Sequence, residues 1–157
     1  MRIAWQFLSV VILFAGMPCI AADLRVIANP SVKISKISPE DLKSVFLVMK
    51  TSLADGSHVE PVLLKSGSVH DTFVREYIGK TAAGLENYYR SLLFAGKGTM
   101  PKMLRSDAEM LEYVRKTRGA IGYVSSGENT EGVKLLEVSS ASPTKGQEQR
   151  SQADARR

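Results

Sequence analysis

The sequence predicts an α/β fold: a small mixed sheet flanked by about four helices. Four short β-type runs, at 24–28, 59–64, 120–124 and 133–138, are rich in Val, Ile and Leu. In the stretches between the first three runs, apolar residues recur at the three- and four-residue spacing of helices that bury one face. Strands separated by such helices are typical of a sheet that helices cover.

The 157-residue chain is predicted to have three parts, the first of which is an export signal over 1–22. Arg2 gives a positive start, 3–17 is almost wholly apolar, and small residues follow. Cleavage after Ala21 or Ala22 would leave a mature protein without cysteine, because Cys19 is the only one. We therefore expect an exported protein without disulfides, thiolate metal sites or cysteine catalysis, and without stable insertion in the membrane.

The other two parts are one domain and a tail. Residues 23–138 suffice for a single core, whereas 139–157 are polar and aperiodic and are predicted to be disordered. With Arg2 and the tail left out, the domain carries 16 basic and 14 acidic residues. Such a small excess, without a dense basic stripe, does not indicate a nucleic-acid partner.

The first half of the domain predicts a strand followed by a helix. The run 24–28 (LRVIA) ends at the turn signal Asn29-Pro30. Ser38 is a suitable N-cap and Pro39 suits the first helical position. Because apolar residues then recur at helical spacing, a helix is expected over 39–48.

The second half predicts two further helices with clear apolar faces. One covers 82–94, with the pair Tyr88-Tyr89 at its core and rim. The other begins at Ser106 and Glu109, which have the spacing of a capping box, and is closed by Gly119.

The stretch 65–73 (KSGSVHDTF) opens a predicted helix and contains the strongest candidate site. Ser68 and Asp71 also have the spacing of a capping box, so Ser68 could simply cap the helix while Gly67 permits the turn. The same residues suit an oxyanion. Backbone N–H groups at a helix start are free, the glycine leaves room, Ser66 and Ser68 carry hydroxyls, and Lys65 adds a charge. The local sequence leaves both interpretations open.

A basic interval forms a second candidate. Between Glu86 and Asp107 the sequence has four cations and no acid: Arg90, Lys97, Lys102 and Arg105. Its part 96–105 is predicted to be a flexible basic loop, which is either a solvated surface or a contact for an anion or an acidic partner.

Catalytic and metal-binding patterns are not found. His58 and His70 lack the spacing of paired metal ligands. The serines beside His70 and Asp71 lie on one helix start, where adjacent side chains point in different directions, so they do not predict a catalytic triad. We expect no enzymatic activity, no metal and no cofactor.

Three segments resemble the phosphate-binding periplasmic proteins of ABC importers, in particular the short, single-lobe members usually labelled phosphate ABC transporter substrate-binding proteins. They are 26–31 (VIANPS), 37–46 (ISPEDLKSVF) and 119–124 (GAIGYV), and the resemblance covers nearly all of 24–125. It implies one lobe of a type 2 periplasmic-binding-protein-like fold, phosphate or a similar oxyanion as ligand, an ABC permease as partner, and a periplasmic location.

The resemblance also favours one interpretation of the turn. In full-length relatives, a serine-glycine-threonine turn at a helix start contributes hydroxyl and backbone donors to phosphate, and Ser66-Gly67-Ser68 resembles that turn. Lys65, with Arg75 or Lys97, is then expected to neutralise the anion. No covalent chemistry is implied.

Two further ligands are expected from the topology of α/β sheets, which bind at the carboxyl ends of strands. These are Asn29 and Ser31, at the exit of the first strand. One lobe would leave the site half open, so we expect weak binding, closure by a second copy as a homodimer, or a wall supplied by another protein. The alternative is an exported interaction module with the same fold and no ligand, which contacts an envelope partner through 96–105.

Overall fold

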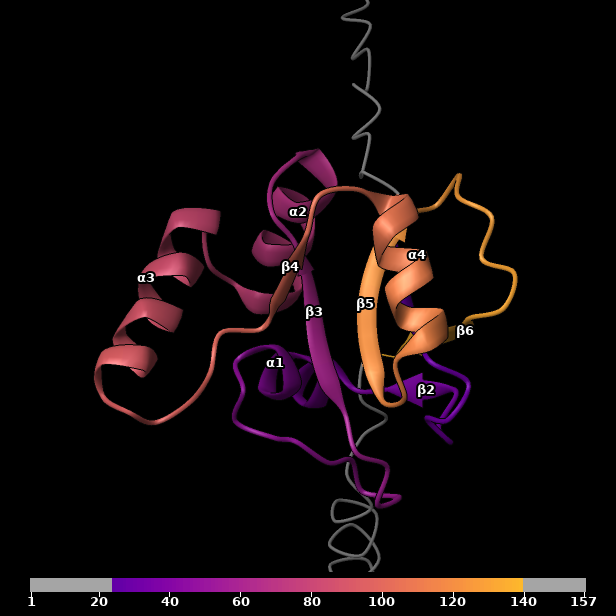
Figure 1. Cartoon of the computed structure of the whole chain (residues 1–157), viewed down its shortest axis with the longest axis horizontal. Coiled ribbons are helices and arrows are strands. Elements are labelled where there is room, and N and C mark those ends of the chain that lie inside the picture. Colours follow the sequence, from indigo (N-terminus) through magenta and orange to yellow (C-terminus); the bar gives the residue numbers. More distant parts are fainter. Residues whose placement is uncertain (1–23, 140–157) are drawn as a thin grey trace, which may run out of the picture.

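The structure is a computed structural model that describes residues 24–139 (Figure 1). The predicted export signal, Cys19 and the tail from 140 onward lie outside the described residues. Within 24–139, none of the helices combines the length and the apolar composition that crossing a membrane requires.

A six-stranded mixed sheet runs through the described domain, in the spatial order β2-β6-β1-β5-β3-β4. Strand β1 pairs antiparallel with both neighbours, β5 and β6, whereas the other pairings are parallel. The chain therefore leaves β1 at one end of the strands and leaves β3 and β5 at the other end. The strands are β1 (Leu24–Ala28), β2 (Lys36–Ile37), β3 (Glu60–Leu64), β4 (Lys102–Leu104), β5 (Ala120–Ser125) and β6 (Lys134–Val138).

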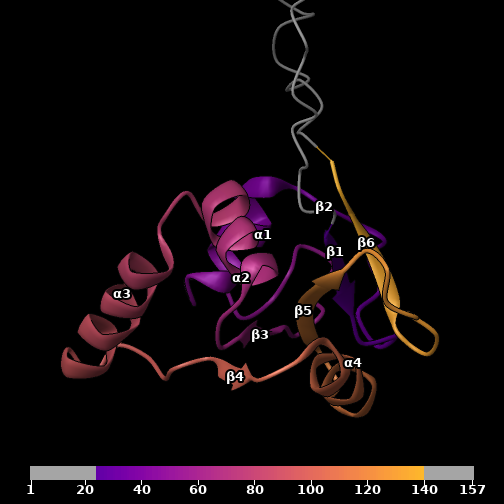
Figure 2. The ribbon, with the colours of Figure 1, turned by 90° about the horizontal axis from the view of Figure 1, so that it is seen from above.

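Four α-helices accompany this sheet in the described residues, which confirms the predicted α/β class. Figure 2 shows α4 on one face of the sheet and α1 and α2 on the other, with α3 to one side. Helix α2 continues without a break into the π-helical turn η1, which Gly79 ends in a left-handed conformation. The helices are α1 (Pro39–Phe46), α2 (Ser68–Phe73), η1 (Val74–Ile78), α3 (Ala82–Phe94) and α4 (Asp107–Lys116).

Strand β5 separates the two halves of the core. Gly122 faces α4, where an added Cβ would lie 2.4 Å from the sulfur of Met110. Tyr123 faces the other way and stacks on Phe73, with ring centroids 3.9 Å apart, while Phe46 packs edge-on against Phe73. Because successive strand residues point to opposite faces, the glycine lets α4 approach closely and the tyrosine supports α1 and α2.

Two of the three predicted N-caps are confirmed. The Ser38 hydroxyl accepts from Asp41 N at 3.1 Å, and that of Ser106 accepts from Glu109 N at 3.2 Å. Helix α1 ends at Phe46 rather than at 48, because the chain turns away at Val48, whose φ is +56°.

Helix α3 is attached to the end of α1 by two tyrosines. Tyr89 is buried and its hydroxyl donates to the Phe46 carbonyl, while half-buried Tyr88 donates to the Leu47 carbonyl at 2.9 Å. Both carbonyls lie at the C-terminal end of α1, where helical partners are missing. The expected core and rim positions of this pair are confirmed.

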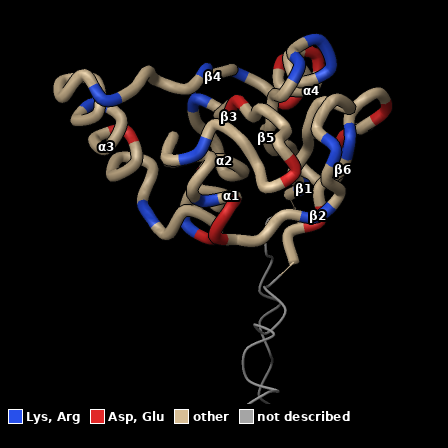
Figure 3. Tube along the Cα trace, turned by 90° about the horizontal axis from the view of Figure 1, so that it is seen from below, with Lys and Arg blue, Asp and Glu red and all other residues tan. Residues whose placement is uncertain are grey.

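The basic interval is more ordered than predicted. Residues 102–104 form the edge strand β4, parallel to β3, so the predicted loop 96–105 is wrong in its second half. A three-residue strand is too short to show the alternation of apolar and polar residues that predicts a strand. It forms because it pairs with β3. Arg90 is paired with Glu86 at 2.8 Å on α3. Figure 3 shows Lys and Arg spread over most elements, with Asp and Glu between them.

Candidate anion-binding site at the end of strand β3

The turn 65–67 connects the carboxyl end of β3 to the start of α2 and is exposed. Gly67 has φ +115° and ψ 166°, a backbone conformation that side-chain-bearing residues rarely adopt. A Cβ built there would meet nothing within 4 Å. The glycine is thus required by the backbone, and the space around it is open to solvent.

Ser68 does not cap the helix, so the predicted capping box is wrong here. The helix begins at Ser68 itself, Gly67 takes the N-cap position, and no side chain supplies a capping hydrogen bond. The first helical bond runs from Asp71 N to Gly67 O at 3.0 Å. Within 24–139, the backbone N–H groups of Ser68, Val69 and His70 have no acceptor outside the helix, and these are the donors that an anion could use.

The buried Tyr123 hydroxyl forms hydrogen bonds to the residues on both sides of this turn. It accepts from Leu64 N, the last residue of β3, at 3.1 Å. The same oxygen lies 2.7 Å from Nδ1 of His70, in the first turn of α2. Sequence reasoning treated Tyr123 only as part of a strand. The available signal was a tyrosine within an apolar strand, since a buried hydroxyl needs partners.

His70 is buried, with 6% of its surface exposed. Among residues 24–139 the Tyr123 hydroxyl hydrogen has no acceptor other than Nδ1 of His70, so we assign this hydrogen to that bond and the imidazole hydrogen to Nε2. Burial lowers the pKa of His70 below its ordinary value, although the charge of Asp71 opposes this. The ring is therefore a neutral hydrogen-bond donor at Nε2.

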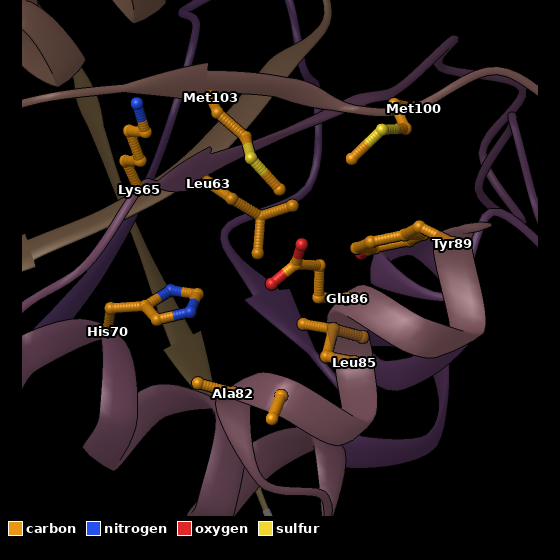
Figure 4. Close-up of a pocket in the computed structure, with 10 residues that line it drawn as sticks. Leu63, Lys65, His70, Ala82, Leu85, Glu86, Tyr89, Met100 and Met103 are labelled. Atoms are coloured by element: carbon orange, nitrogen blue, oxygen red, sulfur yellow. The ribbon is translucent and has the colours of Figure 1, made fainter.

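A cavity of about 280 Å³ adjoins the turn, between β3 and β4 on one side and α3 on the other. Figure 4 shows Lys65 and His70 on one side of it and Glu86 and Tyr89 across from them. Lys65 and His70 are thus shared by the exposed turn and by the cavity.

The other expected cations are not brought to the turn by any contact. Arg75 is exposed in η1 and lies 3.8 Å from Glu76. Lys97 is exposed in the loop after α3, where its backbone N–H caps the Leu92 carbonyl. Lys65 has no acid within salt-bridge distance among residues 24–139, so its charge is available.

Asn29 and Ser31 lie at the other end of the strands from the turn 65–67. The prediction that they join the turn as ligands is therefore wrong. The Asn29 side chain donates to the carbonyls of Val114 and Arg115 and accepts from Ser31 N, so its hydrogen-bonding capacity is used in ending α4. The Ser31 hydroxyl accepts from Gly119 N at 3.0 Å. The physical reason is the antiparallel direction of β1, whose exit faces the start of β3.

Metal binding finds no support among the described residues. No three His, Cys, Asp or Glu side chains of 24–139 lie close enough together to hold an ion.

Comparison with solved structures identifies the architecture. An ABC-type phosphate transport receptor from Vibrio cholerae superposes with a TM-score of 0.57 at 16% identity, over 78% of this chain and 48% of that one. PstS from Borrelia burgdorferi gives 0.58 at 19%, over 83% and 52%. A phosphate ABC transporter substrate-binding protein from Clostridium perfringens, solved with bound phosphate, gives 0.58 at 15%, over 83% and 50%.

No protein-family model matches the chain, and no curated protein matches it either. The chain spans about half the length of the solved structures that it resembles. At such low identities the likeness concerns the fold. The mixed sheet, its helices and these superpositions together show that the chain has the α/β fold of a single lobe of the phosphate-binding receptors of ABC transporters.

Proposed function

We propose that this protein binds phosphate or a similar oxyanion at the turn formed by Lys65, Ser66, Gly67 and Ser68. The observation that carries the proposal is the exposed, uncapped start of α2 at the carboxyl end of β3. The turn and the helix start carry three backbone N–H groups without an acceptor outside the helix, two serine hydroxyls, and the Lys65 ammonium, which no acid of residues 24–139 pairs with. This donor set suits a tetrahedral anion. Arg75 and Lys97 are proposed only as further positive charge.

Binding by one lobe would leave the anion partly hydrated. Phosphate gives up its water only when donors surround it on most sides, and the turn offers donors from one side. A second copy of the chain, or another protein, is proposed to supply the missing wall.

The cellular setting is proposed from the sequence and from the similar structures. The predicted export signal favours the periplasm, and the solved structures of this fold are described as transport receptors. We infer a solute-binding role in, or related to, a phosphate ABC import system, with a permease as partner. A binding protein of this kind has no catalytic step.

One observation favours the alternative, an interaction module with no anion. The end of α3 and the loop after it expose large apolar side chains: Phe94 is 86% exposed, Leu93 44% and Met100 40%. Apolar side chains gathered at one tip are typical of a protein contact. In this alternative the tip and the basic residues after it contact an envelope partner.

Thermal unfolding with a panel of anions separates the two functions. At a hundred times its dissociation constant, a bound anion should stabilise the fold by about 2.7 kcal/mol. Stabilisation by phosphate or sulfate, but not by chloride at equal ionic strength, is the expected result. If a folded sample shows no shift with phosphate at millimolar concentration, the interaction module is favoured.

Ser68→Ala tests the assignment of the site. Because the Ser68 hydroxyl caps nothing, we expect the free energy of unfolding to change by less than about 0.5 kcal/mol. Phosphate affinity should fall about tenfold, as expected for one hydrogen bond to a charged ligand. Ser35→Ala is the matched control, since Ser35 is an exposed serine in the loop before β2. Equal affinities in both variants would show that the anion binds elsewhere.

The proposed second wall predicts a link between phosphate and association. Sedimentation velocity with and without phosphate should show a larger species only when phosphate is present. An unchanged monomer that still binds phosphate would remove the second copy from the proposal.

A further inference from the structure

The cavity beside the turn has walls unlike those of an inorganic phosphate site. Most of its lining is apolar and comes from four elements: Leu63 of β3, Leu85 and Tyr89 of α3, Met100 of the following loop and Met103 of β4. Leu63, Leu85 and Tyr89 are buried parts of the core and form a fixed floor. The two methionines lie toward the surface, and their flexible thioethers can adapt to different shapes.

Two donors lie together at one wall of this cavity. His70 Nε2 has no acceptor among residues 24–139. No fully buried polar side-chain atom of these residues lacks a partner, so Nε2 is accessible to solvent, and His70 is one of the residues that line the cavity. Lys65 lies on the same side of the cavity as His70 (Figure 4), and no acid of the described residues pairs with it.

The acidic group of the cavity is already compensated. Glu86 lies across from His70 (Figure 4). Its carboxylate accepts from Arg90 at 2.8 Å along α3, and both side chains remain more than half exposed to water. The uncompensated groups of the cavity are therefore a cation and a neutral donor, both of which suit an anion.

We propose that this cavity binds a small organic anion. Its apolar body lies against Leu63, Tyr89 and the two methionines, and its acidic head group accepts from His70 Nε2–H and pairs with Lys65. This goes beyond the proposed function, because inorganic phosphate has no apolar body and needs none of these walls. It shares Lys65 with the proposed phosphate site but needs neither the serine hydroxyls nor the backbone N–H groups at the start of α2.

The size of the cavity limits the ligand. Its volume of about 280 Å³ is just below the range of about 300–1,000 Å³ typical of pockets for drug-sized molecules. A head group with an alkyl body of about six carbons fits this limit, and each methylene buried against the apolar walls adds to the affinity. Hexanoate and hexyl phosphate are suitable probes because their alkyl bodies are similar, with five and six carbons, and their acidic heads differ.

Methionine-methyl NMR of the unmodified protein tests the proposal without any variant. With hexanoate or hexyl phosphate, the methyl signals of Met100 and Met103 should shift in a saturable way. Met110 is buried against Gly122, Met49 is 70% exposed, and neither lines the cavity, so their signals should not move. If Met100 and Met103 stay unchanged at 10 mM of both probes (about the weakest affinity of interest), the cavity is not a binding site.

Two comparisons of affinity identify the parts of the ligand that are bound. Hexanol should bind at least about tenfold more weakly than hexanoate, since it lacks the charge that Lys65 pairs with. Equal binding of the two would overturn the anionic part of the proposal. A preference for hexyl phosphate over hexanoate would identify the head group as a phosphate ester, and the reverse preference as a carboxylate; either result fits an organic anion.

Ala83→Phe tests the position of the ligand. Ala83 lines the cavity, is exposed, and is the second residue of α3, so a phenyl group there should fill the cavity and reduce hexanoate affinity about tenfold. Ala108→Phe is the matched control, because Ala108 is exposed and is the second residue of α4. Equal hexanoate affinity in a folded Ala83→Phe variant would overturn the proposal. The affinity for inorganic phosphate should be the same in Ala83→Phe and in the wild type. The proposal for the cavity and the proposal for the phosphate site can therefore fail independently.

Discussion

Tyr123→Phe removes one oxygen atom from the centre of the domain and should have a large effect. The side chain is fully buried and its ring stacks on Phe73, a contact that phenylalanine keeps. The hydroxyl accepts from Leu64 N at 3.1 Å and bonds to His70 Nδ1 at 2.7 Å. A buried N–H left without an acceptor costs about 1–3 kcal/mol, and the second bond contributes about 1 kcal/mol. We therefore expect a loss of about 2–4 kcal/mol.

A loss of this size is a large part of the roughly 5–15 kcal/mol that stabilises a typical domain. Urea denaturation would measure it as a lower midpoint with an unchanged slope. Because the amide of Leu64, the last residue of β3, loses its acceptor, it should also exchange its hydrogen faster in the variant.

Tyr88→Phe is the matched control for this experiment. The Tyr88 hydroxyl donates to the Leu47 carbonyl at 2.9 Å from a half-buried position, where water can take over the acceptor. We expect a loss within about 1 kcal/mol. If Tyr123→Phe costs no more than Tyr88→Phe, the view that Tyr123 holds the turn between β3 and α2 is refuted.

Two further predictions concern the same core. Gly122→Ala places a Cβ 2.4 Å from the Met110 sulfur and should destabilise the fold by about 1–3 kcal/mol; a double-mutant cycle with Met110→Ala should recover part of this loss, and strictly additive losses would contradict the close packing. Because burial lowers the pKa of His70, the unfolded chain binds a proton at higher pH than the folded one, so the stability that neutral His70 contributes is present above about pH 6.5 and is lost as the pH falls toward the lower folded value. Unfolding free energies measured from pH 7.5 to 5 should therefore fall more steeply for the wild type than for His70→Asn, and parallel curves would show that the ring is not protected from protonation.

The helices at Ser38 and Ser106 could be predicted from sequence, because their caps are made by neighbours a few residues apart. The Ser38 hydroxyl and Asp41 N, like Ser106 and Glu109 N, satisfy each other within one turn. Ser68 has the same spacing and no such bond, because the backbone at Gly67, with φ +115°, starts the helix one residue earlier than a Ser68 cap requires. A spacing rule does not contain that dihedral angle.

Some parts of the candidate site could likewise be predicted from sequence, and others could not. The turn at Lys65, Gly67 and Ser68 could be found from sequence, because a strand, a glycine and a helix start follow each other directly. The expected contribution of Asn29 failed because the position of a strand exit depends on the direction of the strand, and β1 alone runs antiparallel in the described sheet. Tyr123 was missed because its partners, Leu64 and His70, lie 59 and 53 residues away in the chain.

The sequence by itself determined the α/β class, the helix starts made by adjacent residues and the turn that carries the proposed anion site, since these depend on local propensity and short-range hydrogen bonds. Only the tertiary structure decided the strand order, the edge strand at Lys102–Leu104, the removal of Asn29 and Ser31 from the site and the cavity beside His70. These features arise from contacts between residues far apart in the chain, and the free energy of such contacts depends on which surfaces the packed core brings together.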